Sequence, residues 1–361
     1  MRIAIDAREL LGRPTGVGRY LTHLLSAWDV LPSAAAHEFI LCAPRGADLP
    51  ARGARVSTCL GGTGSGTWWE QLTLPGLVRR AQADVLFSPA YTGPLRCGVP
   101  MVLAVHDVSF AAHPEWFARQ EGLRRRMLAR LSARTAARVI TISGFSRGEI
   151  ARHLGIPETK IDVIYPAAEP VAVPRPNDNR ENVVLFVGSI FSRRHVPELI
   201  DGFARVARQH RNTRLELVGE NRTAPPIDLD AIVSASGVAG QVTLRSYVPE
   251  DLLAALYASA RAFVFLSDYE GFGLTPLEAL AAGIPIVVLD TPVAREVYGE
   301  AALYVPRPDP ALIGAALEQV LFDAAERSRI LGAAPRTLAR YSWTACAEGV
   351  LKALTRCGRI S

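Results

Sequence analysis

Lysine is nearly absent from this 361-residue chain: Lys160 and Lys352 are the only lysines among its 40 basic residues, and the others are arginine. A pyridoxal phosphate cofactor needs a lysine for its Schiff base. Lys160 precedes a proline-rich segment and Lys352 lies close to the last residue, so neither suits a cofactor site in the second half of the chain. The composition therefore argues against a pyridoxal-dependent phosphorylase.

Cysteine and long apolar runs are also scarce. The five cysteines are scattered and form no C-x-x-C pair, which excludes a readable disulfide framework or zinc site and fits a reducing cytosol. The start of the chain is charged at Arg2, Asp6, Arg8 and Glu9, and no apolar run approaches the ~18 residues of a membrane span. We therefore expect neither a signal peptide nor an integral membrane protein.

Apolar residues as a class are abundant. The chain is 49% hydrophobic and 21% charged, which excludes an intrinsically disordered or fibrous protein. Its length exceeds one ordinary hydrophobic core, so we expect two domains. The net charge is +5, but we find no zinc finger, RNA-binding aromatic motif or long basic tail, and a nucleic acid partner is not expected.

Short apolar runs alternate with stretches of helical length, which is typical of α/β folds with parallel sheets. The predicted strands are Arg2–Asp6, Glu38–Ala43, Ala83–Ser88, Met101–His106, Arg138–Ile142, Lys160–Ile164, Val183–Gly188, Leu215–Gly219, Val242–Leu244, Ala262–Ser267, Ile286–Leu289 and Leu303–Val305. The pattern predicts two Rossmann-like domains, 1–165 and 182–340, joined by a proline-rich linker at 166–181, with a final helix in 341–361 that packs back on the first domain. Ligands of such sheets bind beyond the carboxyl ends of the strands, so we expect the site in the cleft between the domains.

One segment, Ser267–Leu280 with the sequence S-D-Y-E-G-F-G-L-T-P-L-E-A-L, follows an apolar strand and opens a helix. Thr275 fits the position before that helix, with Pro276 as its first residue. Glu278 stands three residues after Thr275, which is the spacing of a capping box. The free N–H groups of a helix start also attract anions, so a phosphate site at Gly271–Thr275 is an equal alternative.

Glu270 and Glu278, within E-G-F-G-L-T-P-L-E-A-L-A-A-G-I-P, resemble the signature of the retaining nucleotide-sugar glycosyltransferases of family 4, which have the GT-B fold. Four other segments are similar to the same family in the same order: TGVGRY at 15–20, VHDVSFAAHPEWF at 105–117, TISGFSRGEIARHLGI at 141–156 and VGSIFSRRHVPELI at 187–200. The resemblance covers nearly the whole chain and implies two Rossmann-like domains that face each other across a cleft.

The resemblance implies a donor site in the second domain. It assigns the hydroxyls of the donor sugar to Glu270 and the ribose to Glu278, and carboxylates suit both as hydrogen-bond acceptors. Glycine in the turn between them permits a close approach of the backbone to a ligand. The turn residues expected to hold sugar or phosphate are Phe272, Gly273, Leu274 and Thr275.

For the leaving diphosphate, the family normally has a lysine, often preceded by arginine, after the first strand of the second domain. Here Arg193 and Arg194 follow Gly188, and Arg194 stands where the lysine is usual. This departure exchanges a compact ammonium for a bidentate guanidinium. Ser189 replaces an arginine that some members carry after the glycine. A solvated surface is the alternative interpretation of the arginine pair.

In the first domain, His106 follows an apolar strand and has Asp107 beside it. The resemblance implies that His106 approaches the donor sugar and that Asp107 belongs to the acceptor side, while a core or turn role is the alternative. Gly16 and Gly18 lie in the turn after the first strand, where the family brings backbone close to the diphosphate or acceptor. T-G-V-G-R-Y is not G-x-G-x-x-G, which argues against a dehydrogenase.

Trp68 and Trp69 follow a glycine-rich run at 61–67. They serve either in core packing or as an acceptor-side platform that stacks on a sugar or lipid.

The segment Arg119–Arg138 is rich in arginine and places Leu123, Met127 and Leu131 on one helical stripe. This pattern indicates either a helix with one packed and one solvated face or peripheral contact with an anionic membrane.

The expected reaction transfers a glycosyl group from a nucleoside-diphosphate sugar to a saccharide or polyprenyl-linked acceptor with retention. We identify no D-x-D metal motif, so the arginines and the helix start would stabilise the leaving group without metal or cofactor. The HD-S-F-x-x-x-P-E-W-F and W-W-E-Q segments resemble mannosyl- and rhamnosyltransferases of bacterial surface polysaccharides, which ranks GDP-mannose first. A UDP- or dTDP-sugar donor, an epimerase and a non-catalytic binding protein are the alternatives, and the expected location is cytoplasmic, at the inner face of the plasma membrane.

Overall fold

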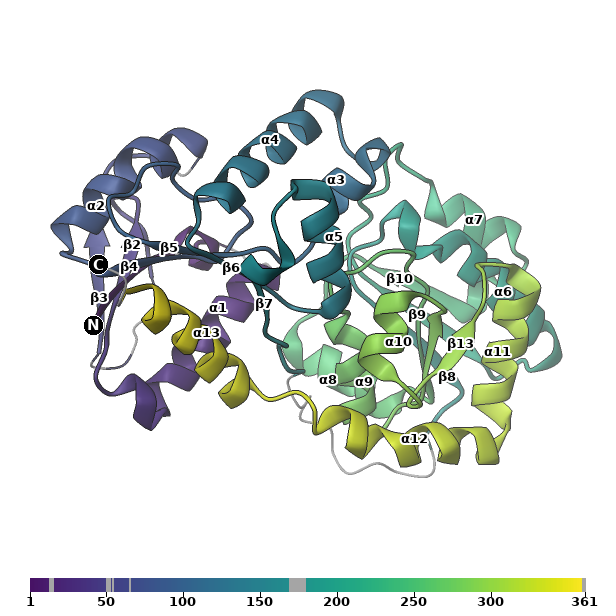
Figure 1. Ribbon diagram of the computed structural model, residues 1–361. Coiled ribbons are helices and arrows are strands. Elements are labelled where there is room, and N and C mark those ends of the chain that lie inside the picture. Colours follow the sequence, from purple (N-terminus) through teal and green to yellow (C-terminus); the bar gives the residue numbers. More distant parts are fainter. Residues whose placement is uncertain (13–15, 50–52, 54, 65, 169–179, 359–361) are drawn as a thin grey trace. The chain divides into compact units, whose positions relative to one another are not determined.

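The computed structural model describes residues 1–361 except 13–15, 50–52, 54, 65, 169–179 and 359–361 (Figure 1). The chain forms two compact units: unit 1 comprises Met1–Pro166 and Tyr341–Ser361, and unit 2 comprises Ala167–Arg340. Most of the predicted linker at 166–181 lies outside the described residues, as do Thr15 of the T-G-V-G-R-Y segment and Ser65 of the glycine-rich run.

Unit 1 is built on a parallel sheet of seven strands in the order β3-β2-β1-β4-β5-β6-β7. The strands are β1 Arg2–Asp6, β2 Glu38–Ala43, β3 Val56–Leu60, β4 Val85–Ser88, β5 Met101–Ala104, β6 Arg138–Thr141 and β7 Ile161–Val163. β3 is the one that the apolar pattern did not predict. It is an edge strand with exposed Ser57 and Thr58 at its centre, so it has no continuous apolar run.

The core of unit 1 lies on both faces of this sheet, because successive residues of a strand point to opposite sides. Ile3 and Ile5 belong to one buried cluster and Ala4 to the other. The first face is covered by α1 (Gly16–Val30) and α13 (Trp343–Gly358), and the second by α2 (Leu74–Arg80), α4 (Arg119–Thr135) and α5 (Gly144–Leu154) (Figure 1). Trp28 Nε1 of α1 donates a hydrogen bond to Ala347 O of α13 at 2.9 Å. The final helix is therefore an integral part of unit 1.

Unit 2 has a parallel sheet of six strands in the order β10-β9-β8-β11-β12-β13. The strands are β8 Val183–Val187, β9 Arg214–Val218, β10 Val242–Arg245, β11 Ala262–Phe265, β12 Ile286–Leu289 and β13 Leu303–Val305. The helices are α6 Val196–Gln209, α7 Leu229–Ala235, α8 Glu250–Ser259, α9 Leu274–Ala281, α10 Pro292–Tyr298, α11 Pro310–Phe322 and α12 Ala324–Leu338. Both units thus have the predicted α/β architecture of parallel sheets covered by helices (Figure 1).

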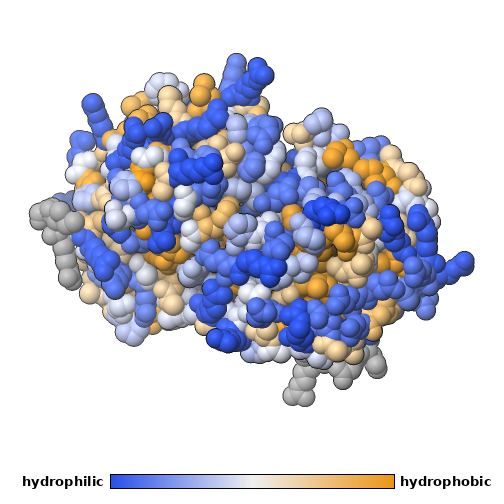
Figure 2. All heavy atoms as spheres, turned by 45° about the vertical axis from the view of Figure 1, so that its right-hand side comes forward, coloured by the Kyte–Doolittle hydropathy of each residue, from blue (hydrophilic) through white to orange (hydrophobic). Residues whose placement is uncertain are grey.

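The apolar stripe of α4 lies on the surface. Leu123 is 62% exposed, Met127 56% and Leu131 37%, so the interpretation of this stripe as a packed face is wrong. α4 packs instead through its small residues, which are Gly122, Ala129, Ser132 and Ala133. Elsewhere, Figure 2 shows hydrophobic residues in small groups among hydrophilic ones on the face that it draws. None of the described helices is long and apolar enough to cross a membrane.

Candidate active site

Two neighbouring strands of unit 2 lead into the loops that carry the predicted donor residues. β8 ends before Gly188 and β11 ends before Leu266, and the two strands pair in parallel. The carboxyl ends of parallel neighbours lie at the same edge of the sheet, which is where ligands bind in this kind of fold. The two loops touch there, because Asp268 N donates to Arg193 O at 3.0 Å.

Arg194 and Glu270 form an ion pair between these loops. Arg194 Nη2 lies 2.7 Å and Nε 2.9 Å from Glu270 Oε1, and Ser267 Oγ donates to the same oxygen at 2.9 Å. The side chains are only 12% and 19% exposed. Among the described residues, the hydrogen bonds to this carboxylate all end on Oε1, which leaves Oε2 able to accept from a ligand. The sequence predicted both residues for the donor site, and the structure brings them into a direct ion pair that the sequence did not predict.

The Arg194 guanidinium has a fixed orientation. Nη1 donates to Ser189 O at 2.7 Å, and the guanidinium carbon lies 4.6 Å from the centre of the Phe265 ring. Gly188 has φ 146°, and a Cβ atom there would lie 2.8 Å from Arg194 Nη1. Glycine at this position therefore gives Arg194 its space, and a solvated-surface role for Arg194 is wrong.

Arg193 and His195 flank Arg194, with Arg193 in the 3₁₀ turn Ser192–Arg194 and His195 directly after it. Arg193 Nε donates to Tyr269 O at 3.3 Å, and its guanidinium lies 4.3 Å from the Phe191 ring centre. His195, which the sequence did not single out, has its Nε2 2.7 Å from Asp268 Oδ2. Burial alone would lower the pKa of His195, but its hydrogen bonds and charge interactions with Asp268 and Glu198 raise it to about 9. The ring is therefore cationic at neutral pH and adds a third positive charge to this turn.

The start of α9 differs from the prediction. The helix begins at Leu274, and the residue before it is Gly273, with φ 93° and no side-chain cap. The predicted capping box of Thr275 with Glu278 is therefore wrong, because Thr275 is already the second residue of the helix. A Cβ atom on Gly273 would lie 2.1 Å from the Tyr298 hydroxyl, which donates to Gly273 O at 2.9 Å. Only glycine fits this turn.

The remaining predicted donor residues lie along the same turn and helix. Phe272 is buried at 2% exposure, so its ring belongs to the core. Glu278 lies one turn into α9, and its Oε2 accepts from Tyr257 Oη at 3.3 Å. Glu278 is thus oriented by a tyrosine of α8 instead of by the helix start.

His106 of unit 1 lies just beyond β5, in contact with α1. Its Nε2 is 3.0 Å from Pro89 O, and the Tyr20 ring meets it edge-on at 4.7 Å between centres. A carbonyl oxygen only accepts, so Nε2 carries the proton and Nδ1 is left as an acceptor. Burial lowers the pKa of His106, which keeps the ring neutral at pH 7. Asp107 Oδ1 accepts from Ser109 N at 2.8 Å, as in a turn that leads into α3 (Ser109–Ala112).

The predicted glycines of the first turn, Gly16 and Gly18, are helical. α1 is described from Gly16 onward, so both belong to its first turn and not to the loop before it. Gly18 is buried in the helix. The prediction that these glycines lie in the turn between strand and helix is therefore wrong.

The tryptophan pair splits between the two interpretations. Trp69 is 3% exposed and its Nε1 donates to Gly61 O at 2.8 Å, so it belongs to the core and its predicted acceptor-side role is wrong. Trp68 is 80% exposed. The pair opens a π-helical turn, Trp69–Thr73, a feature that often accompanies functional sites.

This turn is tied to β1 by a buried charge network that the sequence did not reveal. Arg8 Nη2 lies 2.6 Å from both Asp6 Oδ2 and Glu70 Oε2. Glu70 also accepts from Thr92 Oγ1 at 2.8 Å and from Gln71 Nε2 at 2.9 Å. Burial would lower the pKa of Arg8, but Asp6 and Glu70 raise it. Glu70 follows Trp69 in the sequence, so the W-W-E-Q segment was the sequence feature that could have indicated this charge network.

The statement that the chain has no D-x-D motif is wrong, because Asp228–Asp230 in unit 2 has this spacing. Asp228 caps α7 and accepts from Ala231 N at 3.0 Å. Among the described residues, no group of three or more His, Cys, Asp or Glu side chains is arranged to hold a metal ion. The motif therefore has a helix-capping role.

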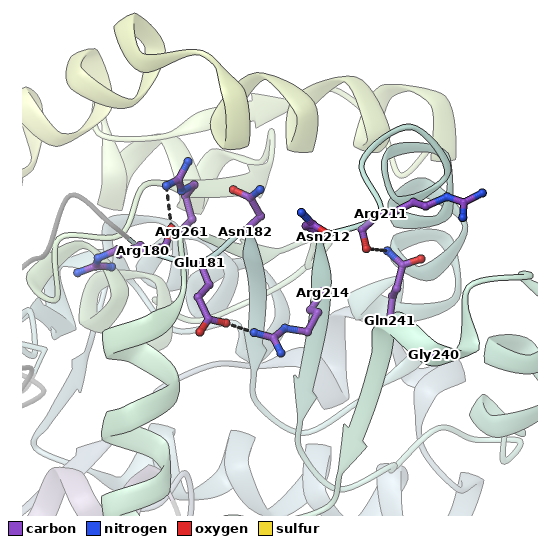
Figure 3. Close-up of a pocket in the computed structure, with 9 residues that line it drawn as sticks. All are labelled: Arg180, Glu181, Asn182, Arg211, Asn212, Arg214, Gly240, Gln241 and Arg261. Atoms are coloured by element: carbon purple, nitrogen blue, oxygen red, sulfur yellow. Dashed lines mark hydrogen bonds and ion pairs between the residues drawn. The ribbon is translucent and has the colours of Figure 1, made fainter.

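A cavity of about 600 Å³ lies at the opposite edge of the unit 2 sheet (Figure 3). Its lining comes from residues at the amino ends of β8 to β11, which are Arg180, Glu181, Asn182, Arg211, Asn212, Arg214, Gly240, Gln241 and Arg261. Figure 3 shows Glu181 turned toward Arg214, with which it is ion-paired. The cavity is therefore separate from the loops that carry Arg194 and Glu270.

Several solved structures superpose on this chain over nearly its whole length. Sucrose-phosphate synthase from Thermosynechococcus elongatus superposes with a TM-score of 0.77 at 18% identity, covering 100% of this chain and 99% of the other. HepE from Anabaena, in complex with UDP and glucose, superposes with a TM-score of 0.72 at 18% identity, covering 98% and 99%. At such identities these likenesses show the GT-B fold, which confirms the predicted fold class.

Similar sequences include two mannosyltransferases. O-antigen chain mannosyltransferase B of Escherichia coli is 27% identical over 70% of this chain and 69% of its own length. O-antigen chain mannosyltransferase RfbU of Salmonella typhimurium is 27% identical over 72% of this chain and 71% of its own length.

Two family models together match nearly the whole chain. Residues 14–170 match Glycosyltransferase Family 4, and residues 172–337 match Glycosyl transferases group 1. The boundary between the models falls at the boundary between units 1 and 2. With the paired arginine and glutamate at the sheet edge of unit 2, these matches establish that the chain belongs to the family 4 glycosyltransferases of group 1.

Proposed function

We propose that this protein transfers a mannosyl group from GDP-mannose to a saccharide or lipid-linked saccharide, with retention, in the synthesis of a cell-surface polysaccharide. Mannose as the sugar is supported by the O-antigen mannosyltransferases among the similar proteins. The observation that carries the reaction class is the Arg194–Glu270 pair at the carboxyl ends of β8 and β11, with Arg193 beside it.

The chemistry follows from the charges of this site. A departing nucleoside diphosphate gains negative charge, which Arg193, Arg194 and the amino end of α9 would stabilise in a fixed geometry. Glu270 Oε2 would accept a hydroxyl hydrogen bond from the donor sugar. The acceptor oxygen bonds to the anomeric carbon on the face that the phosphate leaves, and the acceptor proton passes to that phosphate oxygen. No metal or cofactor takes part in these steps.

Unit 1 would contribute acceptors and a stacking surface. The unprotonated Nδ1 of neutral His106 suits a hydrogen bond from a sugar hydroxyl, and the backbone at Gly16 allows a close approach because nothing lies within 4 Å of its Cβ position. The exposed Trp68 ring suits stacking on a saccharide or a lipid chain. Asp107 would orient the segment that follows His106.

A donor screen tests the function. GDP-mannose, UDP-glucose and dTDP-rhamnose are added at saturating concentration while thermal unfolding is recorded, and a ligand at 100 times its Kd should add about 2.7 kcal/mol. We expect GDP-mannose to protect most. Turnover with a glycan acceptor should then give a product with retained anomeric configuration by NMR, at an unchanged rate in EDTA. An inverted product, or activity that EDTA abolishes and Mn²⁺ restores, would contradict the proposed mechanism.

A UDP-sugar is the second candidate donor, since the HepE structure of the same fold contains UDP and glucose. Stronger protection by UDP-glucose than by GDP-mannose would favour it. Consumption of the nucleotide sugar without any acceptor would indicate an epimerase instead, and binding without consumption a non-catalytic protein.

We also propose that α4 contacts an anionic membrane at which a lipid-linked acceptor resides. Its stripe of Leu123, Met127 and Leu131 is exposed, and arginines flank the stripe on the same helix. Apolar side chains bordered by arginine suit the interface of an anionic bilayer. Each arginine near such a surface contributes about 1 kcal/mol, falling away within a Debye length.

A further inference from the structure

His195 has an unusual backbone conformation between the two donor-site loops. Its φ is 49° and its ψ 40°, the left-handed region that glycine and asparagine adopt most readily. It stands between the 3₁₀ turn Ser192–Arg194 and the first residue of α6. A bulky residue persists in such a conformation where its surroundings hold it there.

Two carboxylates hold the ring. Nε2 lies 2.7 Å from Asp268 Oδ2 in the loop after β11, and Nδ1 lies 3.7 Å from Glu198 Oε1 in the first turn of α6. The His195 side chain is 16% exposed. Both ring nitrogens can serve as donors only when both carry protons, so the contacts favour the imidazolium.

The segment 193–195 is joined to 268–270 by a ladder of contacts. The backbone of Arg193 accepts from Asp268 N, and Arg193 Nε reaches Tyr269 O. Arg194 pairs with Glu270, and His195 pairs with Asp268. Of these links, the His195–Asp268 pair is the one that depends on the proton of an imidazole.

We infer that His195 is a positioning residue of the donor site. Its imidazolium contacts both Asp268 and Glu198, an arrangement that we call the clasp. The clasp holds Arg193 and Arg194 in the geometry that receives the diphosphate of the nucleotide. This inference rests on the proposed function. It adds to that function a pH dependence of donor binding that comes from the protein. The charged groups that interact with His195 are Asp268 and Glu198, and Arg193 and Arg194 precede it in the chain.

The direction of the pH effect follows from the charges. Because the pKa of His195 is raised from 6.5 to about 9 in the folded protein, the clasp is fully formed at neutral pH. It is lost as pH rises through about 9 and the ring becomes neutral. Donor affinity should therefore fall above pH 9 by more than the ionisation of the nucleobase alone causes.

The decisive variant is His195→Gly, because glycine accepts the left-handed backbone without strain and the fold should survive, as a melting temperature close to that of the parent would show. Binding of GDP, UDP and dTDP is measured by calorimetry at pH 7.5 and pH 10. We expect the variant to bind about tenfold more weakly at pH 7.5 and equally at pH 10. Nucleobase ionisation affects both proteins alike and cancels in their ratio.

Two further variants sharpen the test. Asp268→Asn should weaken binding to a similar extent at pH 7.5 and should add nothing further in the His195→Gly background. His210→Asn is the matched control, because His210 at the other end of α6 also faces a carboxylate, Glu318 at 3.5 Å. It should bind like the parent at both pH values.

Equal binding by the parent and His195→Gly at pH 7.5, or a ratio between them that does not change with pH, would overturn the role of His195 while leaving the proposed function intact. A parent protein that binds none of the three nucleotides would overturn both.

Discussion

At the residue scale, Glu270 is a carboxylate whose orientation is fixed because one of its oxygens already accepts hydrogen bonds from the protein. Oε1 is held by Arg194 and Ser267, so its partners fix where Oε2 points. Such a preorganised acceptor stabilises a reacting sugar without having to reorganise during the reaction. The same pair keeps Arg194 from leaving its place between Phe265 and Ser189.

Glu270→Gln should therefore lower transfer about a hundredfold, as loss of one preorganised electrostatic contact does, with little change in melting temperature. Initial rates under donor saturation and a thermal melt measure both effects. Glu216→Gln is the control, since Glu216 is similarly buried at 13% exposure and pairs with Arg245 across two strands of the same unit. If Glu270→Gln retained the activity of the control, the assignment of Glu270 would be wrong.

Arg8 is a second residue whose charge matters because of where it lies. Its partners Asp6 and Glu70 are 6% and 3% exposed, so removing Arg8 leaves two buried carboxylates without a counter-ion. Arg8→Ala should reduce the free energy of unfolding by about 3 to 5 kcal/mol. Urea denaturation measures this, with Arg147→Ala as the control for an exposed pair to Glu158, which should cost less than about 1 kcal/mol. Similar costs for the two variants would show that the buried network adds nothing to stability.

At the element scale, α4 is a helix whose apolar stripe of Leu123, Met127 and Leu131 is exposed to solvent. Replacing Leu123 and Met127 with serine should reduce sedimentation with vesicles of phosphatidylglycerol severalfold, because the apolar side chains that enter the interface are lost. Binding should also fall with added salt, since arginines supply the attraction. Val30→Ser, at a residue 81% exposed on α1, is the matched control. Unchanged sedimentation of the double variant would show that α4 is an ordinary surface helix.

The same scale shows what could be predicted from the sequence. Apolar runs located the strands that are buried in each sheet, but not β3, whose exposed edge needs no such run. Thr275 and Glu278 had the spacing of a capping box, but the positive φ of Gly273 starts α9 earlier. His195 was missed because its partner Asp268 is distant in sequence and meets it only through the pairing of β8 with β11. The local sequence pattern predicts helices and strands. Contacts between side chains of different loops, such as His195 with Asp268, depend on which strands are neighbours in the sheet.

At the scale of the whole molecule, the resemblance to family 4 glycosyltransferases is confirmed across both units. Arg194 and Glu270, which we predict to bind the donor, meet in unit 2 between the loops after β8 and β11. Unit 1 has its own set, His106, Tyr20 and the turn that presents Trp68. The predicted site residues are thus divided between the two units, and no single sequence motif contains them all.

The return of the chain to unit 1 has a consequence for its biosynthesis. Unit 2 is one uninterrupted segment of the chain. The first face of the unit 1 sheet, in contrast, is covered completely only when α13 packs on it with the apolar side chains around Ala347. As the polypeptide leaves the ribosome, Trp28 and its neighbours stay without that cover until all of unit 2 has been synthesised. The half of the protein that is translated first is therefore the last to be finished.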